Sequence, residues 1–187
     1  DSKGSSPVVL VLSACGGLDD HVTTEWPKYL TELGYAAFVI DILGSRNVLS
    51  ECSSGTIPLD ERMRDVYGAL AFLAQHPAVD SQRIYMIGFS WGGSHVLEAA
   101  LQRRLPQFNT TEKAAFKGGI AVYPDCKGIA GAVTQRNVRP AFYAPVLIIG
   151  AELDNWTAYA PWSLNTTLAM VNARELTPLT RPPFVKA

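Results

Sequence analysis

The sequence predicts an α/β fold: a mainly parallel sheet of about five strands with helices on both faces. The predicted strands are short, continuously apolar runs, as expected for strands buried on both faces. They alternate with helical patterns or long connections, which is the order typical of parallel sheets. A chain of 187 residues can bury a sizeable core. We therefore expect residues 1–187 to form a single domain.

The expected strands are the main apolar segments, at Pro7–Ser13, Tyr35–Asp41, Arg83–Gly88, Phe116–Tyr123 and Pro145–Ala151. In open sheets of this class, ligands bind beyond the carboxyl ends of the strands. The loops that follow these strands are therefore where chemistry is expected.

The expected helices are segments with helical spacing or capping signals, at residues 23–33, 59–75, 91–104 and 158–173. Thr23 or Thr24 could cap the first helix, and Pro27 fits only its first turn. Gly34 is expected to end that helix. Prolines at 178, 182 and 183 predict an irregular tail over residues 174–187.

Charge and composition exclude several classes of protein. The chain carries 16 Lys or Arg and 17 Asp or Glu, with no basic stripe, so nucleic acid is not an expected partner. No apolar run approaches the roughly 18 residues of a membrane span, so no membrane partner is expected. Cys15, Cys52 and Cys126 lack metal-ligand spacing, so we expect no metal and no cofactor. Whether Cys15 pairs with Cys52 is left open.

The stretch around Ser90 organises the chain. Gly88, Ser90 and Gly92 form G-x-S-x-G, with an apolar strand before it and a helix after it. That context is typical of a nucleophile elbow, a tight turn that holds a serine hydroxyl off the end of a strand. The alternative is a glycine-rich turn in which the serine has no catalytic role.

With the elbow placed, the chain resembles the dienelactone hydrolase family of α/β-hydrolases, from about Val8 to Trp156. The motifs that carry the resemblance are Cys15-Gly16-Gly17-Leu18, Gly34-Tyr35 before Asp41, Gly44-Ser45-Arg46, Arg62 with Asp65, Gly88 to Gly93, and Glu152 to Thr157. The last motif resembles the acid-bearing turn of a secreted or periplasmic-type branch. The resemblance implies an α/β-hydrolase-like fold and a small-molecule ester or lactone substrate.

This sequence departs from the family pattern in three ways. Ser90 stands where dienelactone hydrolases proper have cysteine, which favours a general carboxylic ester as substrate. Ser13 and Ala14 stand where relatives have His-Gly. Relatives also carry a hairpin before the first strand and a further strand after the fifth, and we expect both to be absent here. The expectation is a truncated or divergent hydrolase.

The resemblance assigns roles in acyl transfer. Ser90 is the expected nucleophile and Asp154 the expected acid, with Glu152 a weaker candidate. Asp154 could instead cap the helix that follows it. The expected oxyanion hole combines the backbone N–H of Trp91 with that of Cys15 or Gly16.

The catalytic base is the missing part. The only histidines are His21, His76 and His95, and none follows Asp154. His76 is expected at the surface and His95 in packing within its helix. His21, after the first loop, is a possible substitute base or a residue of the pocket wall.

Substrate-binding residues are more open. Arg46 and Arg62 could hold a substrate carboxylate, or could form structural ion pairs with Asp65 or Asp41. Tryptophans 91, 156 and 162 could line an apolar acyl pocket or fill the core, and Trp156 is retained as a candidate for substrate binding. Cys126 is expected to be inert.

Two hypotheses follow. The first is a serine hydrolase that forms an acyl-enzyme on Ser90. The second is a catalytically impaired hydrolase scaffold that binds a ligand or partner without turning it over. A nucleotide-binding domain is a poor match, because the first loop has only Gly16-Gly17 and no G-x-G-x-x-G.

Overall fold

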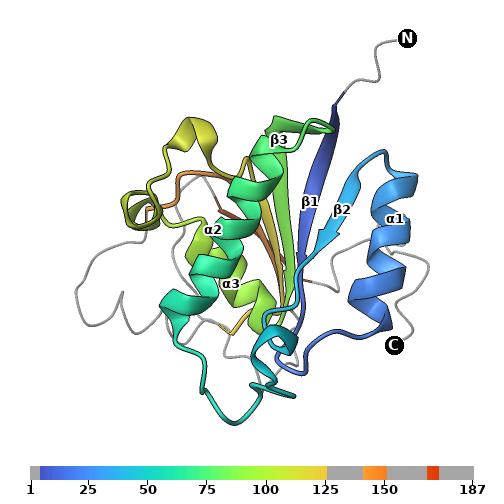
Figure 1. Ribbon diagram of the computed structural model, residues 1–187, viewed down its shortest axis with the longest axis vertical. Helices are drawn as coiled ribbons and strands as arrows, with labels where there is room; N and C mark the ends of the chain where they lie inside the picture. The colour runs from blue at the N-terminus through green and yellow to red at the C-terminus, as the bar shows by residue number, and fades with distance from the viewer. Residues whose placement is uncertain (1–4, 126–140, 151–167, 173–187) are drawn as a thin grey trace.

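The computed structural model describes residues 5–125, 141–150 and 168–172. Its centre is a six-stranded sheet in the order β2-β1-β3-β4-β5-β6, and every pair of neighbouring strands is parallel (Figure 1). The strands are β1 Ser6–Leu12, β2 Ala36–Val39, β3 Val79–Phe89, β4 Gly119–Val122, β5 Val146–Gly150 and β6 Leu168–Asn172. The predicted parallel α/β sheet is therefore confirmed.

Helices cover both faces of the sheet. α1 (Trp26–Glu32) lies on one face, and α2 (Leu59–Gln75) and α3 (Trp91–Ala99) lie on the other (Figure 1). A π-helical turn, His21–Glu25, leads into α1, and short 3₁₀ turns occupy Gly44–Arg46, Gln102–Arg104, Pro106–Phe108 and Glu112–Ala114. Within the described residues, no helix is both long and apolar enough to cross a membrane.

Successive side chains of β1 point to opposite faces of the sheet and pack into two separate hydrophobic clusters. Val8, Leu10 and Leu12 pack with α2 and α3, whereas Val9 and Val11 pack with the α1 side. All five are at most 7% exposed. Burying such a side chain contributes about 1.5–3 kcal/mol. β1 is thus fixed from both sides, and with it the position where its following loop begins.

Several elements differ in length from the sequence prediction; β2 and β4, for example, are shorter than the predicted strands. β3 begins at Val79 rather than Arg83. α3 ends at Ala99 rather than near Arg104, because the next residues turn to pair with another segment: Leu101 forms an antiparallel bridge with Phe142, and the Gln102 N–H donates to the Ala141 carbonyl at 2.8 Å.

The start of the first helix also differs. Neither Thr23 nor Thr24 caps it; instead the Asp19 carboxylate accepts the Val22 N–H at 3.1 Å, and the chain enters through the π-helical turn. Pro27 does lie in the first turn of α1, and Gly34 follows the helix with φ +85°, as expected for a residue that ends it.

The prediction of a helix over residues 158–173 is wrong at residues 168–172, which form β6. A segment of five residues, four of them apolar, does not distinguish helix from strand by periodicity. Pairing decides the outcome, because β6 extends the sheet in register with β5. The expected absence of a strand after the fifth is wrong for the same reason. The predicted tail, 174–187, lies outside the described residues.

Candidate active site

Ser90 lies in a strained turn between β3 and α3. Its backbone has φ 50° and ψ −111°, a region that non-glycine residues rarely adopt. A Cβ added to Gly88 would meet the Gly92 carbonyl oxygen at 2.2 Å, and one added to Gly92 would meet the Leu12 oxygen at 2.4 Å. Only glycine fits at both places, so the G-x-S-x-G spacing forms an elbow.

Backbone contacts with β4, with α3 and with the end of β1 hold the elbow in place. The Ser90 N–H donates to the Val122 carbonyl at 2.9 Å, at the carboxyl end of β4. The Ser94 N–H donates to the Ser90 carbonyl at 3.0 Å. Gly92 presses on the end of β1, where its added Cβ would also meet the Ser13 oxygen at 2.5 Å. The half-buried Ser90 hydroxyl makes no hydrogen bond to any residue that the structure describes.

The expected oxyanion donors lie at two neighbouring chain segments. Trp91 is the first residue of α3, and the first N–H groups of a helix lack partners within it. Cys15 and Gly16 are the central residues of a turn closed by the Gly17 N–H, which donates to the Ala14 carbonyl at 3.1 Å. Among the described residues, no acceptor is bonded to the N–H of Cys15 or of Gly16.

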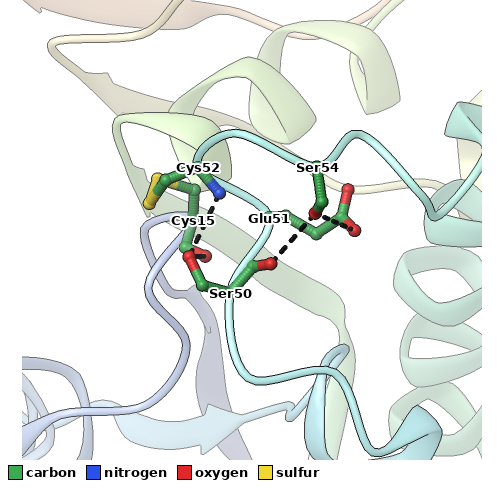
Figure 2. Close-up of a disulfide and its surroundings, with 5 residues drawn as sticks. All are labelled: Cys15, Ser50, Glu51, Cys52 and Ser54. Carbon is green, nitrogen blue, oxygen red and sulfur yellow. Dashed lines mark hydrogen bonds between the residues drawn. A yellow bond between two sulfur atoms is a disulfide. The ribbon is translucent and has the colours of Figure 1, made fainter.

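A disulfide joins this turn to the loop before α2. Cys15 and Cys52 are bonded, with their Cα atoms 4.8 Å apart (Figure 2). The Glu51 N–H donates to the Cys15 carbonyl at 2.8 Å. The pairing that the sequence left open is therefore formed.

His21 lies beside the elbow but is engaged by other side chains. Its ring contacts Phe89, the residue before Ser90, with centroids 4.8 Å apart. Its Nε2 accepts from Trp26 Nε1 at 3.0 Å, so Nδ1 carries the proton and donates to the Glu25 carboxylate at 3.2 Å. Sequence reasoning missed Glu25 and Trp26, although the four-residue spacing of His21 and Glu25 could have indicated the first pair.

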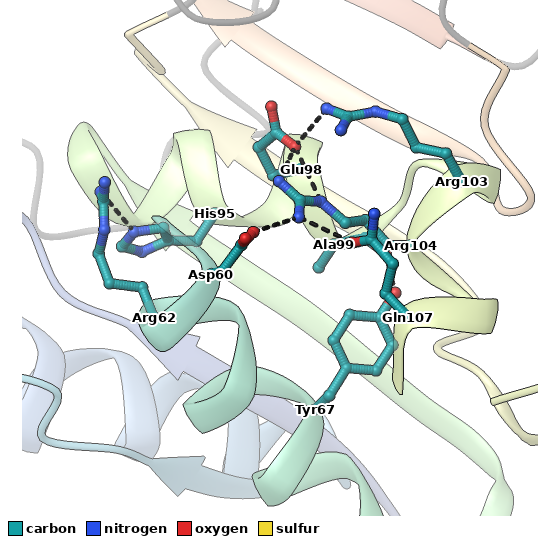
Figure 3. Close-up of polar contacts among 9 residues, drawn as sticks. All are labelled: Asp60, Arg62, Tyr67, His95, Glu98, Ala99, Arg103, Arg104 and Gln107. Carbon is teal, nitrogen blue, oxygen red and sulfur yellow. Dashed lines mark hydrogen bonds and ion pairs between the residues drawn. The ribbon is translucent and has the colours of Figure 1, made fainter. Parts of the chain in front are cut away.

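His95 is buried behind the elbow, 1% exposed, and packs on Trp91 with ring centroids 4.2 Å apart. Arg62 Nη1 lies 3.2 Å from His95 Nε2 (Figure 3). Burial, reinforced by the Arg62 charge, lowers the pKa of His95 to about 3. His95 is therefore a neutral packing residue, as predicted. His76 is exposed, also as predicted, at the end of α2 and before the amino end of β3.

The two arginines have different surroundings. Arg46 makes a bidentate pair with Asp65, at 2.7 and 3.1 Å, and also donates to the Ile42 carbonyl. The structural ion pair is thus the arrangement that Arg46 adopts. The Arg62 guanidinium instead lies over the Trp91 ring, 5.0 Å from its centroid. Burial lowers the pKa of Arg62, and the charges of Glu51 and Glu98 oppose that shift.

Asp41 also has a structural role. Its carboxylate accepts the N–H groups of Leu43 and Gly44 at 3.1 and 2.8 Å, and so shapes the turn after β2.

A second charged cluster ties α3 to α2. Glu98 and Arg104 are both nearly buried and lie 3.0 Å apart, and Arg104 also reaches Asp60 at 2.7 Å (Figure 3). Burial lowers the pKa of Arg104, but the two carboxylates outweigh this and raise it. No sequence spacing links these residues, because they meet only when the helices pack.

The remaining predicted site residues, Asp154, Glu152, Trp156, Trp162 and Cys126, lie outside the described residues. In the part of the chain that the structure describes, no group of three or more His, Cys, Asp or Glu side chains could hold a metal ion.

The elbow, the neighbouring turn and the parallel sheet agree with a match over residues 1–172 to the model of the dienelactone hydrolase family. The chain belongs to the dienelactone hydrolase family. At the centre of its G-x-S-x-G motif this family member has Ser90.

Two curated relatives of this dienelactone hydrolase family member are bacterial. One, from Bradyrhizobium sp, is 33% identical over 104 residues, 52% of this chain and 42% of its own, and is named "Probable 2-oxo-3-(5-oxofuran-2-ylidene)propanoate lactonase". The other, a candidate carboxymethylenebutenolidase from Methylorubrum extorquens, is 27% identical over 157 residues, 77% of this chain and 50% of its own. The chain thus spans about half the length of the curated relatives it matches.

A solved structure supports the fold. Est1E from Butyrivibrio proteoclasticus, solved with bound ferulic acid, has a TM-score of 0.61 and 18% identity, over 83% of this chain and 72% of its own. At that identity the likeness concerns the fold alone.

Proposed function

We propose that this protein is a serine hydrolase of the dienelactone hydrolase type, which cleaves a small carboxylic ester or lactone through an acyl-enzyme on Ser90. The observation that carries the proposal is the strained backbone of Ser90, with φ 50° between β3 and α3. Strain of this kind costs about 1–3 kcal/mol, persists only where the surrounding structure enforces it, and is concentrated at active sites. Family membership and the lactonase named among the relatives support the same reaction class.

In the proposed reaction, Ser90 Oγ attacks the carbonyl carbon and loses its proton to a base. The negative charge on the carbonyl oxygen is met by the Trp91 N–H and by the N–H of Cys15 or Gly16. The bond to the alcohol oxygen then breaks and that oxygen takes up the proton. Water attacks the acyl-enzyme and releases the acid, restoring the serine. Asp154, which follows β5 in the sequence, would orient the base.

His21 is the candidate base among the described residues. Its Nδ1–H already donates to Glu25, which is how a carboxylate fixes the tautomer of a catalytic histidine. Its Nε2 is the basic nitrogen, but Trp26 occupies it at 3.0 Å. His21 could therefore serve Ser90 only if its ring exchanged the Trp26 indole for the serine hydroxyl.

The test is hydrolysis of p-nitrophenyl butyrate together with labelling by a fluorophosphonate. Ser90→Ala should abolish both, while Ser81→Ala, at the far end of β3, should leave both unchanged. His21→Gln should lower kcat by about 10²-fold or more if His21 is the base, because general-base catalysis contributes about 10²–10⁴-fold. His76→Gln is its matched control. Turnover that survives Ser90→Ala would contradict the proposal.

A second candidate is a hydrolase scaffold that binds a ligand or partner without turnover. The observation that favours it is that both ring nitrogens of His21 are bonded elsewhere and His95 is buried against Trp91. Under this alternative the unmodified protein does not label at Ser90, whereas an activated serine labels.

A further inference from the structure

The turn that carries two candidate oxyanion donors is attached to a second loop by three bonds. Cys52 binds Cys15 through the disulfide. The Cys15 carbonyl accepts from Ser50 Oγ at 3.4 Å (Figure 2). It also accepts from the Glu51 N–H at 2.8 Å. Residues 50–52, far from Cys15 in the sequence, therefore restrain both its side chain and its carbonyl.

Restraining the carbonyl also restrains an N–H. A trans peptide is planar, so its C=O and N–H point in opposite directions. Because the Cys15 carbonyl faces Glu51, the Gly16 N–H faces away from that loop. The Ala14 carbonyl accepts from Gly17, which fixes the Cys15 N–H in the same way. Both donors are thus oriented by bonds that their own peptide carbonyls make.

Glu51 anchors the second loop. It is 6% exposed, and its carboxylate accepts from Ser54 Oγ at 3.1 Å and from the N–H of Thr56 at 3.0 Å, as well as from the Thr56 hydroxyl. Burial would raise the pKa of Glu51, but these hydrogen bonds and one from the Ile57 N–H outweigh it and hold the pKa below its usual range. Glu51 is therefore a buried carboxylate that fixes residues 51–57.

We propose that Cys52 and Glu51 are positioning residues for the oxyanion hole: they hold the Ala14–Gly17 turn so that its N–H groups meet the oxyanion formed at Ser90. The inference rests on the serine hydrolase function proposed above. Cys52 is exposed, so a reductant can reach the disulfide. Opening it should impair the transition state more than substrate binding, since the oxyanion exists only after Ser90 has attacked.

The kinetic test compares the oxidised and reduced protein in a Cys126→Ser background, which removes the third thiol. Dithiothreitol reduces the S–S bond to two thiols and is itself oxidised to its cyclic disulfide. We expect kcat to fall about ten- to a hundredfold, below the 10²–10³-fold loss seen when a whole oxyanion donor is removed. KM should stay within about twofold, and affinity for a trifluoromethyl ketone, which forms an oxyanion on the serine, should fall in parallel with kcat.

Two variants and a control extend the test. Cys52→Ser and Glu51→Gln should reproduce the kcat loss, and Ser53→Ala, an exposed position in the same loop, should not. Far-UV circular dichroism and thermal melting follow the fold. A reduced protein that keeps its fold and its kcat overturns the inference, as does a kcat loss that occurs only together with unfolding.

A second measurement does not depend on turnover. On reduction, amide exchange at Glu51, whose N–H donates to Cys15, should accelerate at least tenfold, while exchange at Met63 in α2 stays unchanged. Unchanged exchange at Glu51 overturns the inference even in an inactive protein. Failure of Ser90 to label in the oxidised protein instead overturns the proposed function, so the two failures are distinguishable.

Discussion

The guanidinium of Arg62 lies over the indole of Trp91, with Cζ 5.0 Å from the ring centroid, and the same arginine reaches His95 Nε2 at 3.2 Å. An arginine can only donate, so His95 Nε2 accepts and Nδ1 carries the proton. Burial and the neighbouring cation together keep this histidine neutral. Trp91, the residue after Ser90, therefore packs against a positive charge and an uncharged imidazole ring.

The buried His95 makes stability depend on pH. Its pKa is about 3 when folded and about 6.5 when unfolded, so between these values only the unfolded chain takes up the proton. This contribution to stability is complete above pH 6.5 and is lost as pH falls toward 3. From pH 7 to pH 5, the free energy of unfolding should fall by about 2 kcal/mol through His95.

Urea denaturation at both pH values measures this loss. His95→Gln, which does not titrate, should show a pH dependence smaller by about the same 2 kcal/mol. Glu51 has little effect on this measurement. Folding lowers the pKa of its carboxyl group, so the stability that Glu51 contributes is lost mainly as pH falls below about 4.5. An identical pH dependence in the variant would show that His95 is not held neutral.

The ion pair between Glu98 and Arg104 gives a matched pair of substitutions. Arg104 is 4% exposed, whereas Arg103, which contacts the same Glu98 oxygen at 2.8 Å, is 52% exposed. Arg104→Met should destabilise the protein by about 3 kcal/mol, because it removes the buried partner of Glu98 and leaves a nearly buried carboxylate with only the half-exposed Arg103. Arg103→Met should cost at most about 1 kcal/mol. Equal losses in chemical denaturation would contradict this difference.

Replacing two glycines near the site by alanine should have different effects on stability. The Cβ of Gly92→Ala would lie 2.4 Å from the Leu12 carbonyl oxygen, and backbone cannot move aside as a flexible side chain can. We expect a loss of at least about 3 kcal/mol or failure to fold, in line with severe overpacking. The added Cβ of Gly16→Ala would meet nothing within 4 Å, so the stability of this variant should hardly change. The melting temperature measures both variants.

The parts of the fold that sequence predicts well have dense local signals. The apolar runs identify five of the strands, and the G-x-S-x-G motif identifies the elbow because close backbone contacts at Gly88 and Gly92 leave no room for a side chain on either side of Ser90. β6 has no such signal, since residues 168–172 become a strand only by pairing with β5. The end of α3 is set in the same way, by the distant bridge of Leu101 to Phe142.

The site was less predictable because its supports come from distant segments. Glu51 and Cys52 meet Cys15 only in the folded chain, and nothing in the spacing of three cysteines indicates which two will pair. No local pattern indicates that the hydroxyls of Ser54 and Thr56 bind a buried carboxylate, Glu51. Arg46 and Arg62 look alike in the sequence, and packing alone separates the bidentate ion pair from the cation over Trp91.

The strain at Ser90 leads to a final prediction. Ser90→Ala and Ser90→Gly both remove the hydroxyl, but only glycine adopts φ 50°, ψ −111° without strain. Relief of about 1–3 kcal/mol of strain, less the 0.5–1 kcal/mol that glycine costs through the entropy of the unfolded chain, should leave Ser90→Gly about 1 kcal/mol more stable than Ser90→Ala. Ser94→Gly against Ser94→Ala is the control, and there glycine should be the less stable variant because position 94 lies inside α3. Chemical denaturation measures the free energy of unfolding of the four variants. If the alanine variant is more stable than the glycine variant at position 90, as expected at position 94, the elbow stores no strain. The opposite order at position 90 would show that the backbone conformation of the serine costs stability.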